Sequence, residues 1–289
     1  MKKTLPNNFG GLPSKYSNYK NSKIVLLPVP FDKTSSWIKG ADKGPKAIIN
    51  ASMNMELYDI ETASEVYTKG IHTARQVVSE TSKGIVDKVH AKVKDLLKDD
   101  KFVIVMGGEH TVSLGSIRAH AEKFDDISIL HLDAHSDKRD SYEGDKFSHA
   151  CVMARSQEAV RDIVSVGIRS MDSSELGNIN KKNMFYASDI RKSDSWMQKA
   201  VNKLSGNVYI TVDLDVFDPS IMPSTGTPEP GGMGWYQVLN LIETVSKKKN
   251  IVGFDVVELC PSKHNPAPDF LAAKLIYKLL SLIFRQGSR

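Results

Sequence analysis

The sequence predicts a three-layer α/β/α sandwich built on a mostly parallel central sheet. Short β-branched runs alternate with helix-length amphipathic stretches along the chain, and most of these runs are nearly continuous in apolar residues. Alternating βα units give parallel sheets, and strands that helices cover on both faces are apolar throughout. Because the chain has no internal repeat and no Pro-rich hinge, we expect one such domain.

The elements follow from this alternation in chain order. The first strand is Ile24–Val29, and a helix begins near Gly44 and Pro45, because proline suits the first helical turn. Further strands are predicted at Phe102–Met106, Ile127–Leu132, Ile163–Val166, Val208–Val212 and Ile251–Val257. Helical spacing of apolar residues predicts helices at Gly84–Leu97, Val112–Lys123, Ser195–Leu204, Trp235–Lys247 and Leu271–Phe284.

The first 22 residues differ in composition from the rest of the chain. They are polar and rich in Asn, Gly, Ser and Lys, which is typical of an arm that docks on a neighbour or stays loose. We therefore expect the fold to begin at Lys23, with residues 23–289 forming a single domain.

Composition excludes several classes of protein. The chain is 40% hydrophobic and 25% charged, close to ordinary globular usage. Its net charge of +5 comes with short, scattered basic clusters, so we expect no nucleic-acid partner. The start lacks an apolar signal segment and no run approaches the ~18 apolar residues of a membrane helix, so we expect a cytoplasmic protein with no membrane partner. Two cysteines, Cys151 and Cys260, are too few for a disulfide framework.

Polar side chains follow three of the predicted strands, at the points where the strands end. The run from Phe102 leads into Gly-Gly-Glu-His110, the run from Ile127 into Asp-Ala-His-Ser-Asp137, and the run from Val208 into Asp-Leu-Asp215. Ligands of open α/β sheets bind outside the carboxyl ends of the strands. These three segments are therefore predicted to meet at one crevice.

The spacing of these residues points to metal. Side chains at positions i and i+2 of an extended segment share a face, which groups Asp133 with His135 and Asp137, and Asp213 with Asp215. Such acids would be costly to bury together without a cation. Four carboxylates and two imidazoles, with no thiol, favour manganese, with cobalt or iron tolerated, over a structural zinc. Six ligands suit two ions roughly 3.5–4 Å apart.

Each segment alone also has a structural explanation. A Gly-Gly pair before Glu-His110 is often only a tight turn, and Asp213-Leu-Asp215 is a common turn or helix-capping sequence. Asp133-Ala-His-Ser-Asp137 is harder to explain in this way, because it places polar side chains at the edge of a buried sheet. The three segments together favour the metal site.

These motifs resemble the signatures of a known family. Gly107-Gly-Glu-His-Thr111, Asp133-Ala-His-Ser-Asp137 and Asp213-Leu-Asp-Val-Phe-Asp-Pro219 are similar to those of the arginase/agmatinase ureohydrolases, as is the following Pro223–Gly232 segment. The resemblance extends over nearly the whole chain, from the Gly44 segment to Asp255-Val-Val-Glu258.

The resemblance implies a role for each motif residue. Two manganese ions per subunit would be held by His110, Asp133, His135, Asp137, Asp213 and Asp215. His149 matches the proton-shuttle histidine, Glu258 the acid that orients the guanidinium, and Thr227 lies in the loop beside it, while Asp137 also acts on the nucleophile. Without the resemblance, His149 reads as a partly buried histidine and Glu258 as a strand-end acid paired to a surface lysine.

The implied activity is cleavage of a guanidino compound to urea and an amine, with agmatine the leading substrate and putrescine its product. The segment Lys138–Ser148 lacks the Ser-Gly-Asn loop with which arginases bind the amino-acid end of arginine. Lys138 and Arg139 could nevertheless meet a carboxylate, which keeps arginine and guanidinobutyrate open. Other classes also remain open: a one-zinc deacetylase-like hydrolase and a non-catalytic regulator with this fold. The resemblance further implies a homo-oligomer, a trimer or a hexamer.

Overall fold

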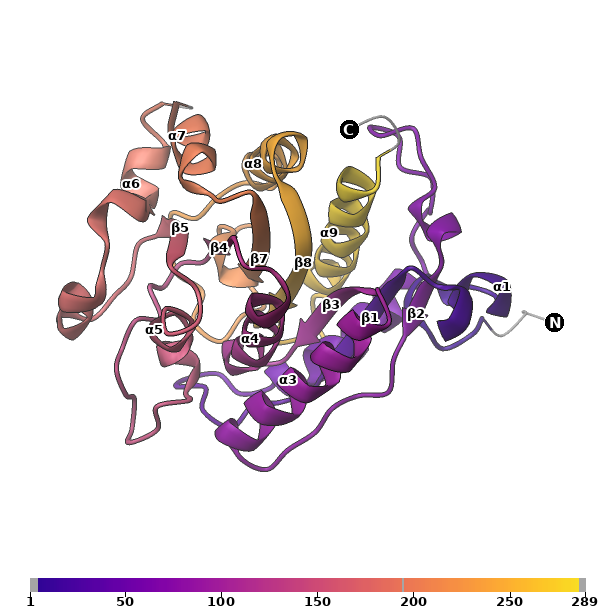
Figure 1. The fold of residues 1–289 in the computed structure, drawn as a ribbon, viewed down its shortest axis with the longest axis horizontal. Coiled ribbons are helices and arrows are strands. Elements are labelled where there is room, and N and C mark those ends of the chain that lie inside the picture. Colours follow the sequence, from indigo (N-terminus) through magenta and orange to yellow (C-terminus); the bar gives the residue numbers. More distant parts are fainter. Residues whose placement is uncertain (1–4, 194, 286–289) are drawn as a thin grey trace.

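A single eight-stranded sheet organises the part of the chain that the structure describes (Figure 1). The computed structural model describes residues 5–193 and 195–285. The strand order is β2-β1-β3-β8-β7-β4-β5-β6, and every pairing between these strands is parallel. The strands are β1 (Ile24–Val29), β2 (Ile71–Thr73), β3 (Phe102–Gly107), β4 (Ile127–Leu132), β5 (Asp162–Ile168), β6 (Met184–Tyr186), β7 (Asn207–Asp213) and β8 (Asn250–Val257).

Helices cover both faces of this sheet, as the predicted sandwich requires. One layer holds α2, α7, α8 and α9, and the other holds α3, α4 and α5. The α-helices are α1 (Ser14–Ser17), α2 (Gly44–Ser52), α3 (Ser82–Lys98), α4 (Ser113–Lys123), α5 (Val152–Ser156), α6 (Ala187–Ile190), α7 (Ser195–Lys203), α8 (Trp235–Lys248) and α9 (Ala267–Ile283). Short 3-10 helices are η1 (Phe9–Gly11), η2 (Tyr19–Asn21), η3 (Ala41–Lys43), η4 (Val66–Lys69), η5 (His110–Val112), η6 (His149–Cys151), η7 (Ser173–Asn178), η8 (Lys181–Asn183) and η9 (Leu214–Val216).

The apolar residues of strand β1 pack into the core on both faces of the sheet. Ile24 and Leu26 pack into the core beneath α9, while Val25, Leu27 and Val29 pack into the core beneath α3. Successive strand side chains point to opposite faces, so a strand covered on both sides is apolar at every position. All six residues of β1 are buried.

The N-terminal segment is part of this core. Phe9 and Leu12, which lie in or next to η1, are buried against the cluster that includes Ile24 and Ile71. Residues 1–22 were expected to form an arm that docks on a neighbour or stays loose, with the fold beginning at Lys23; residues 1–4 of this arm lie outside the described residues. The few apolar residues in this polar stretch anchor it, so the packed structure begins before Lys23.

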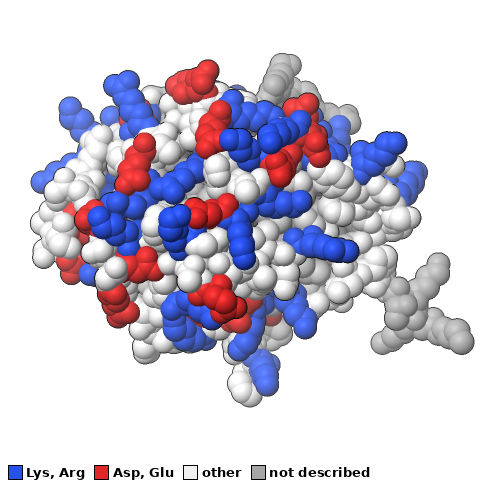
Figure 2. All heavy atoms as spheres, turned by 60° about the horizontal axis from the view of Figure 1, so that its bottom comes forward, with Lys and Arg blue, Asp and Glu red and all other residues white. Residues whose placement is uncertain are grey.

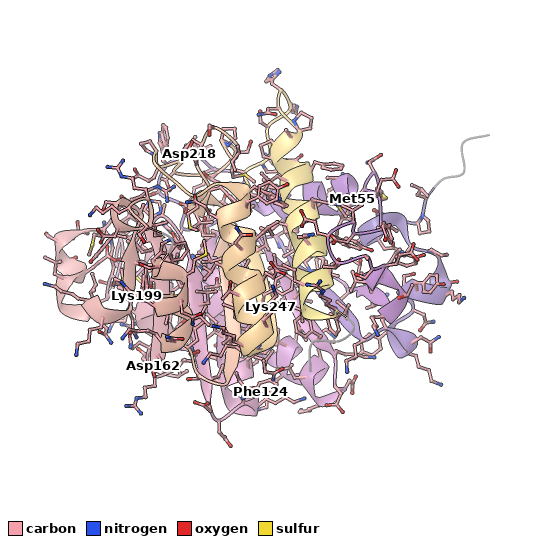
Figure 3. All side chains as sticks on the ribbon, turned by 90° about the horizontal axis from the view of Figure 1, so that it is seen from above. Met55, Phe124, Asp162, Lys199, Asp218 and Lys247 are labelled. Carbon is pink, nitrogen blue, oxygen red and sulfur yellow. The ribbon has the colours of Figure 1, made fainter. Side chains whose placement is uncertain are left out.

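The two ends of the sheet are distinct. In Figure 3, Asp218, which follows β7, and Phe124, which precedes β4, lie at opposite ends of the molecule. The carboxyl ends of the strands therefore share one edge. On the face drawn in Figure 2, lysine and arginine side chains are interspersed with acidic ones rather than gathered in one patch. No helix within the described residues is both long and apolar enough to span a bilayer.

Candidate metal centre and active site

Four neighbouring strands carry the predicted residues to one place. β3, β8, β7 and β4 lie side by side in the middle of the sheet. His110 follows β3, Glu258 follows β8, Asp213 ends β7 and Asp133 follows β4. Parallel strands end at the same edge, so residues far apart in sequence converge there.

His110 lies at the centre of a first group of ligand atoms. Its Nδ1 atom is 3.0 Å from Asp137 Oδ2, 3.2 Å from Asp133 Oδ2 and 3.5 Å from Asp213 Oδ2. This nitrogen is buried and has no hydrogen-bond partner among the described residues. A nitrogen lone pair that faces three carboxylates needs a cation between them, which a proton or a metal ion can supply.

His135 lies at the centre of a second group. Its Nδ1 atom is 2.8 Å from Asp215 Oδ2 and 3.7 Å from Asp133 Oδ1. His135, Asp133 and Asp215 bring ligand atoms within 4.8 Å of one another, as an ion site requires. Asp133 thus offers one oxygen to each group, so the two groups share a carboxylate. This arrangement fits a pair of ions rather than one.

The electrostatics of the cluster also favour a positive charge. Burial raises the pKa of Asp213 well above its usual value, and the charges of Asp215 and Asp133 add to this. Burial opposes the protonation of His135, but the Asp215 and Asp133 carboxylates raise its pKa to about 12. Since divalent ions neutralise carboxylates more fully than protons on imidazoles do, the donor set fits a metal pair.

A second set of contacts orients the ligand residues. His110 Nε2 lies 2.8 Å from Thr211 Oγ1, which in turn donates to Asp255 Oδ1 at 2.7 Å. His131 Nε2 lies 2.7 Å from Asp133 Oδ2. All of these side chains are buried. Such outer contacts hold metal ligands in place and tune their basicity.

The segments that carry these acids were predicted to be extended, but part of their backbone forms turns. Asp215 lies in the 3-10 turn η9, and the side chain of Asp213 accepts a hydrogen bond from its backbone N–H. Asp137 has a φ of 49°. The acids do meet, but turns rather than strand alternation bring Asp137 and Asp215 to the site.

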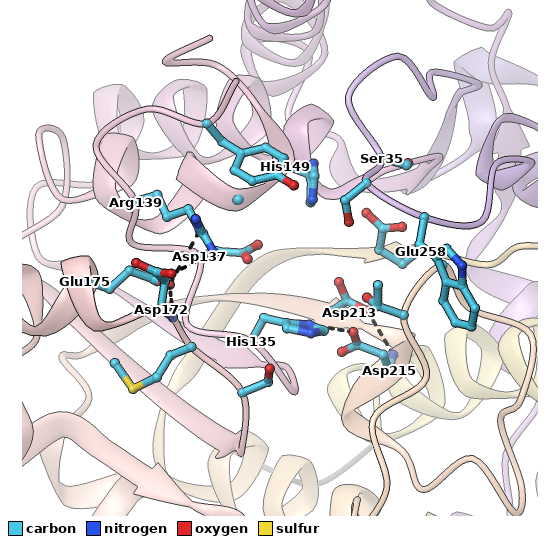
Figure 4. Close-up of a pocket in the computed structure, with 18 residues that line it drawn as sticks. Ser35, His135, Asp137, Arg139, His149, Asp172, Glu175, Asp213, Asp215 and Glu258 are labelled. Atoms are coloured by element: carbon cyan, nitrogen blue, oxygen red, sulfur yellow. Dashed lines mark hydrogen bonds and ion pairs between the residues drawn. The ribbon is translucent and has the colours of Figure 1, made fainter. Parts of the chain in front are cut away.

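A cavity of about 270 Å³ opens above these groups (Figure 4). Seven of the predicted site residues line it: His135, Asp137, His149, Asp213, Asp215, Thr227 and Glu258. His110 and Asp133 lie beneath it, fully buried. Glu258 Oε1 accepts the backbone N–H of His110 at 2.7 Å, and burial raises the pKa of Glu258 well above its usual value. The structure therefore brings together every predicted residue.

One wall of the cavity carries charges that sequence reasoning missed. Asp172 and Glu175 follow β5 and flank Arg139, whose nitrogens lie 3.5 Å from Asp172 Oδ2 and 3.8 Å from Glu175 Oε1. These two acids could have been predicted from the sequence, because β5 is a fourth strand whose carboxyl end leads into acidic residues. Lys138 is buried, and its Nζ lies 3.1 Å from Gln157 Oε1, so it does not line the cavity.

Other missed residues come from segments without a motif. Ser35, Ser36 and Trp37 reach the cavity from the loop between β1 and η3. No periodic pattern marks such a loop. His131, by contrast, could have been found by extending the i, i+2 pattern of Asp133 backwards by one step.

A parallel sheet with paired His–Asp groups beneath a polar cavity defines a class of protein, the metal-dependent hydrolases with a three-layer α/β/α fold. The chain belongs to the arginase family, whose model matches residues 22–281. It is therefore a ureohydrolase, a hydrolytic enzyme that is similar to the agmatinases.

Individual relatives match over nearly the full chain. The N(1)-aminopropylagmatine ureohydrolase of Thermus thermophilus is 36% identical, with 93% of this chain and 92% of the relative covered. The protein of that name from Synechocystis is 33% identical, with 95% of each covered. The crystal structure of agmatine ureohydrolase of Thermoplasma volcanium superposes with a TM-score of 0.86 at 32% identity, covering 98% of this chain and 96% of that one.

Proposed function

We propose that this enzyme uses two manganese ions to hydrolyse a linear guanidino-amine to urea and an amine, and that agmatine, which gives putrescine, is its leading substrate. The observation that carries this proposal is the buried Nδ1 of His110, which faces the carboxylates of Asp133, Asp137 and Asp213. A second group around His135 provides the place for a second ion.

The donor atoms support manganese in particular. The six candidate ligands offer carboxylate oxygens and imidazole nitrogens, and neither cysteine lies among them. Hard, oxygen-rich sets of this kind suit manganese, whereas thiolates select zinc. When bound, a pair of divalent ions would neutralise the carboxylates and lower the pKa of water to about 7.

The cavity residues have the positions and chemistry for the remaining steps. Glu258 is an acceptor for the guanidinium N–H groups, because a carboxylate and a guanidinium pair through two parallel hydrogen bonds. Asp137 accepts a hydrogen bond from the water that attacks the guanidinium carbon. As the C–N bond to the amine breaks, His149 passes the proton released by that water to the departing nitrogen.

The acidic cavity wall that carries Asp172 and Glu175 favours a substrate with an amine at the end opposite its guanidino group. Arg139 lines the cavity on this wall, and it already faces these two carboxylates. Lys138 lies outside the cavity lining. A substrate that ends in a carboxylate, such as arginine or guanidinobutyrate, would therefore meet acids rather than free cations.

N(1)-aminopropylagmatine is a second candidate. Four relatives that match at least 93% of this chain are named N(1)-aminopropylagmatine ureohydrolase. Trp37 also lines the cavity, and this residue is 69% exposed. It therefore presents an aromatic face at the entrance of the cavity. A longer cationic chain would pack against this face through apolar and cation–π contact.

The substrate is tested by measuring urea release from agmatine, N(1)-aminopropylagmatine, arginine and guanidinobutyrate at saturating manganese. We expect the highest kcat/KM with agmatine. A higher value with N(1)-aminopropylagmatine would favour the second candidate, and a higher value with either carboxylate substrate would contradict the amine-end assignment. No urea from any of them would contradict the proposed function.

The role of the metal groups is tested by Asp213→Ala. This change removes one of the three carboxylates that face His110 Nδ1, and we expect it to abolish both tight manganese binding and urea release. Manganese retention is measured by elemental analysis after dialysis. Full activity in this variant would contradict the proposed mechanism.

A further inference from the structure

Thr34 lies between the candidate shuttle histidine and a buried acid. Its Oγ1 is 3.1 Å from His149 Nδ1 and 2.6 Å from Glu109 Oε1. The backbone N–H of His149 also donates to this oxygen, at 3.1 Å. Glu109 is fully buried, one residue before His110. Three segments that are distant in the sequence are thus joined through one hydroxyl.

The surroundings of Glu109 decide which way the hydroxyl points. Glu109 Oε2 accepts the backbone N–H groups of Thr34 at 2.7 Å and Ser35 at 3.0 Å. Its Oε1 accepts the hydroxyls of Thr34 and Thr111, at 2.6 and 2.8 Å. A carboxylate has acceptors only, so the single proton of the Thr34 hydroxyl is directed to Glu109.

The orientation of that hydroxyl sets the tautomer of the histidine. Since the Thr34 proton goes to Glu109, Thr34 Oγ1 is left as an acceptor toward His149, and His149 Nδ1 has to donate. The other ring nitrogen, Nε2, then carries the lone pair, and it makes no hydrogen bond with the described residues. Which ring nitrogen holds the proton is set by the partner of the other one.

We propose that Glu109 and Thr34 are positioning residues that hold His149 as its Nδ1–H tautomer, so that Nε2 is the atom that takes up and releases the transferred proton. This inference rests on the proposed function of His149 as the proton shuttle. Thr34 acts through His149 and is not assigned a contact with the substrate.

The loop that carries Thr34 is fixed from its other end by a second acid. Asp32 Oδ2 accepts the backbone N–H of Gly40 at 2.6 Å and that of Ala41 at 3.1 Å. Together with the two N–H groups that Glu109 accepts, this ties both ends of a segment that contains no helix or strand. The hydroxyl is therefore held in place before substrate binds, as a positioning role requires.

Ser148 offers the competing arrangement. Its Oγ lies 3.3 Å from the same His149 Nδ1, and this hydroxyl is able to donate. If Ser148 donated, His149 would be the opposite tautomer, with the proton on Nε2. Thr34 makes the shorter contact and has a defined proton direction, so the structure favours Thr34 as the partner.

Kinetics of three variants separate the two arrangements. Thr34→Val keeps the shape of the side chain but removes the hydroxyl, and we expect kcat to fall about 10- to 100-fold while KM changes less than about threefold. Thr34→Ser restores the hydroxyl and should recover most of kcat. Ser148→Ala should cost less than Thr34→Val. If the order of these two losses were reversed, or if Thr34→Ser failed to recover kcat, the proposal would be overturned.

The tautomer can also be read without activity. The full-length chain, labelled with ¹⁵N-histidine and loaded with a diamagnetic divalent ion, is examined by NMR, and the His149 signals are assigned by their loss in His149→Gln. We expect a protonated Nδ1 and an unprotonated Nε2 in the wild type, and a mixture in Thr34→Val. A wild-type Nε2–H signal would overturn the relay even if urea were released, whereas an absence of urea release would overturn the proposed function alone.

Discussion

Two of the candidate site residues hold backbone conformations that side chains rarely adopt. Asp137 has a φ of 49° and Glu258 a φ of 67°. Left-handed backbone costs a non-glycine residue of order 1–3 kcal/mol, and such strain clusters at functional sites. Glycine would relieve the strain at either position but would remove the carboxylate. The chain therefore keeps an acid at two places where the backbone alone would favour glycine.

The charge of Glu258 is predicted to matter more than its shape. Glu258→Gln keeps an oxygen that can accept the N–H of His110 but removes the negative charge that faces the guanidinium. We expect kcat/KM to fall about 100-fold or more, because the lost interaction is with a charged group in a closed site. Elemental analysis of the variant should still find its manganese. A loss of less than threefold would contradict the role of Glu258.

At the scale of single residues, the sequence predicted site residues wherever a polar residue followed or ended an apolar run. His110, Asp133 and Asp213 each follow or end a strand, and that contrast singles them out. Thr34 and Trp37 could not be found in this way, because their loop has no periodicity. Their positions depend on contacts with Glu109 and with the cavity, which exist only in the folded chain.

Among the elements, the long strands and helices could be predicted to within a few residues at most ends. Helix α9 begins at Ala267, four residues before the predicted start, and places Pro268 in its first turn. The strands β2 and β6 were missed. Each has three residues at an edge of the sheet, and three residues are too few to show alternation.

The turn that delivers His110 depends on a close approach between the ends of β1 and β3. A Cβ atom at Gly108 would lie 2.0 Å from the backbone oxygen of Phe31, a distance that no side chain tolerates. We expect Gly108→Ala to lower the free energy of unfolding by about 3 kcal/mol or more and to weaken manganese binding, because overpacking would displace Glu109 and His110.

Gly177→Ala is the matched control, since a Cβ there meets nothing within 4 Å. Urea denaturation of both variants measures the difference. If Gly108→Ala were as stable as the control, the close packing of this turn would not be what positions His110.

Across the whole molecule, a buried ion pair ties the loop after α2 to the last helix. Lys278 Nζ lies 2.9 and 3.0 Å from the two carboxylate oxygens of Asp59. Burial acts to raise the pKa of Asp59, but the hydrogen bonds from Lys278 and Thr62 outweigh it and lower the pKa below its usual value. The folded state therefore gains stability from this carboxylate above about pH 4, and loses it as the pH falls through the lowered value.

Asp59→Asn is expected to lower the free energy of unfolding by about 2–3 kcal/mol at pH 7, because the buried Lys278 would keep Glu61 as its charged partner but lose the charge of Asp59. Denaturation at several pH values should show the difference from wild type narrowing below about pH 4. Glu56→Gln, an exposed change, is the control and should stay within about 0.5 kcal/mol. A difference that did not depend on pH would contradict the electrostatic origin.

We propose that the chain assembles into a homo-oligomer. The family resemblance implies a trimer or a hexamer, which would have three or six times the chain mass of 32.0 kDa. Light scattering coupled to size-exclusion chromatography measures this mass directly.

The central claim is that acids and imidazoles at the ends of the three strands β3, β4 and β7 form two ion sites that share Asp133. Its most direct test is the number of manganese ions that remain on each full-length chain after equilibrium dialysis, counted by elemental analysis. We predict about two ions per chain. One ion or fewer, under conditions in which manganese is in excess, would contradict the paired centre.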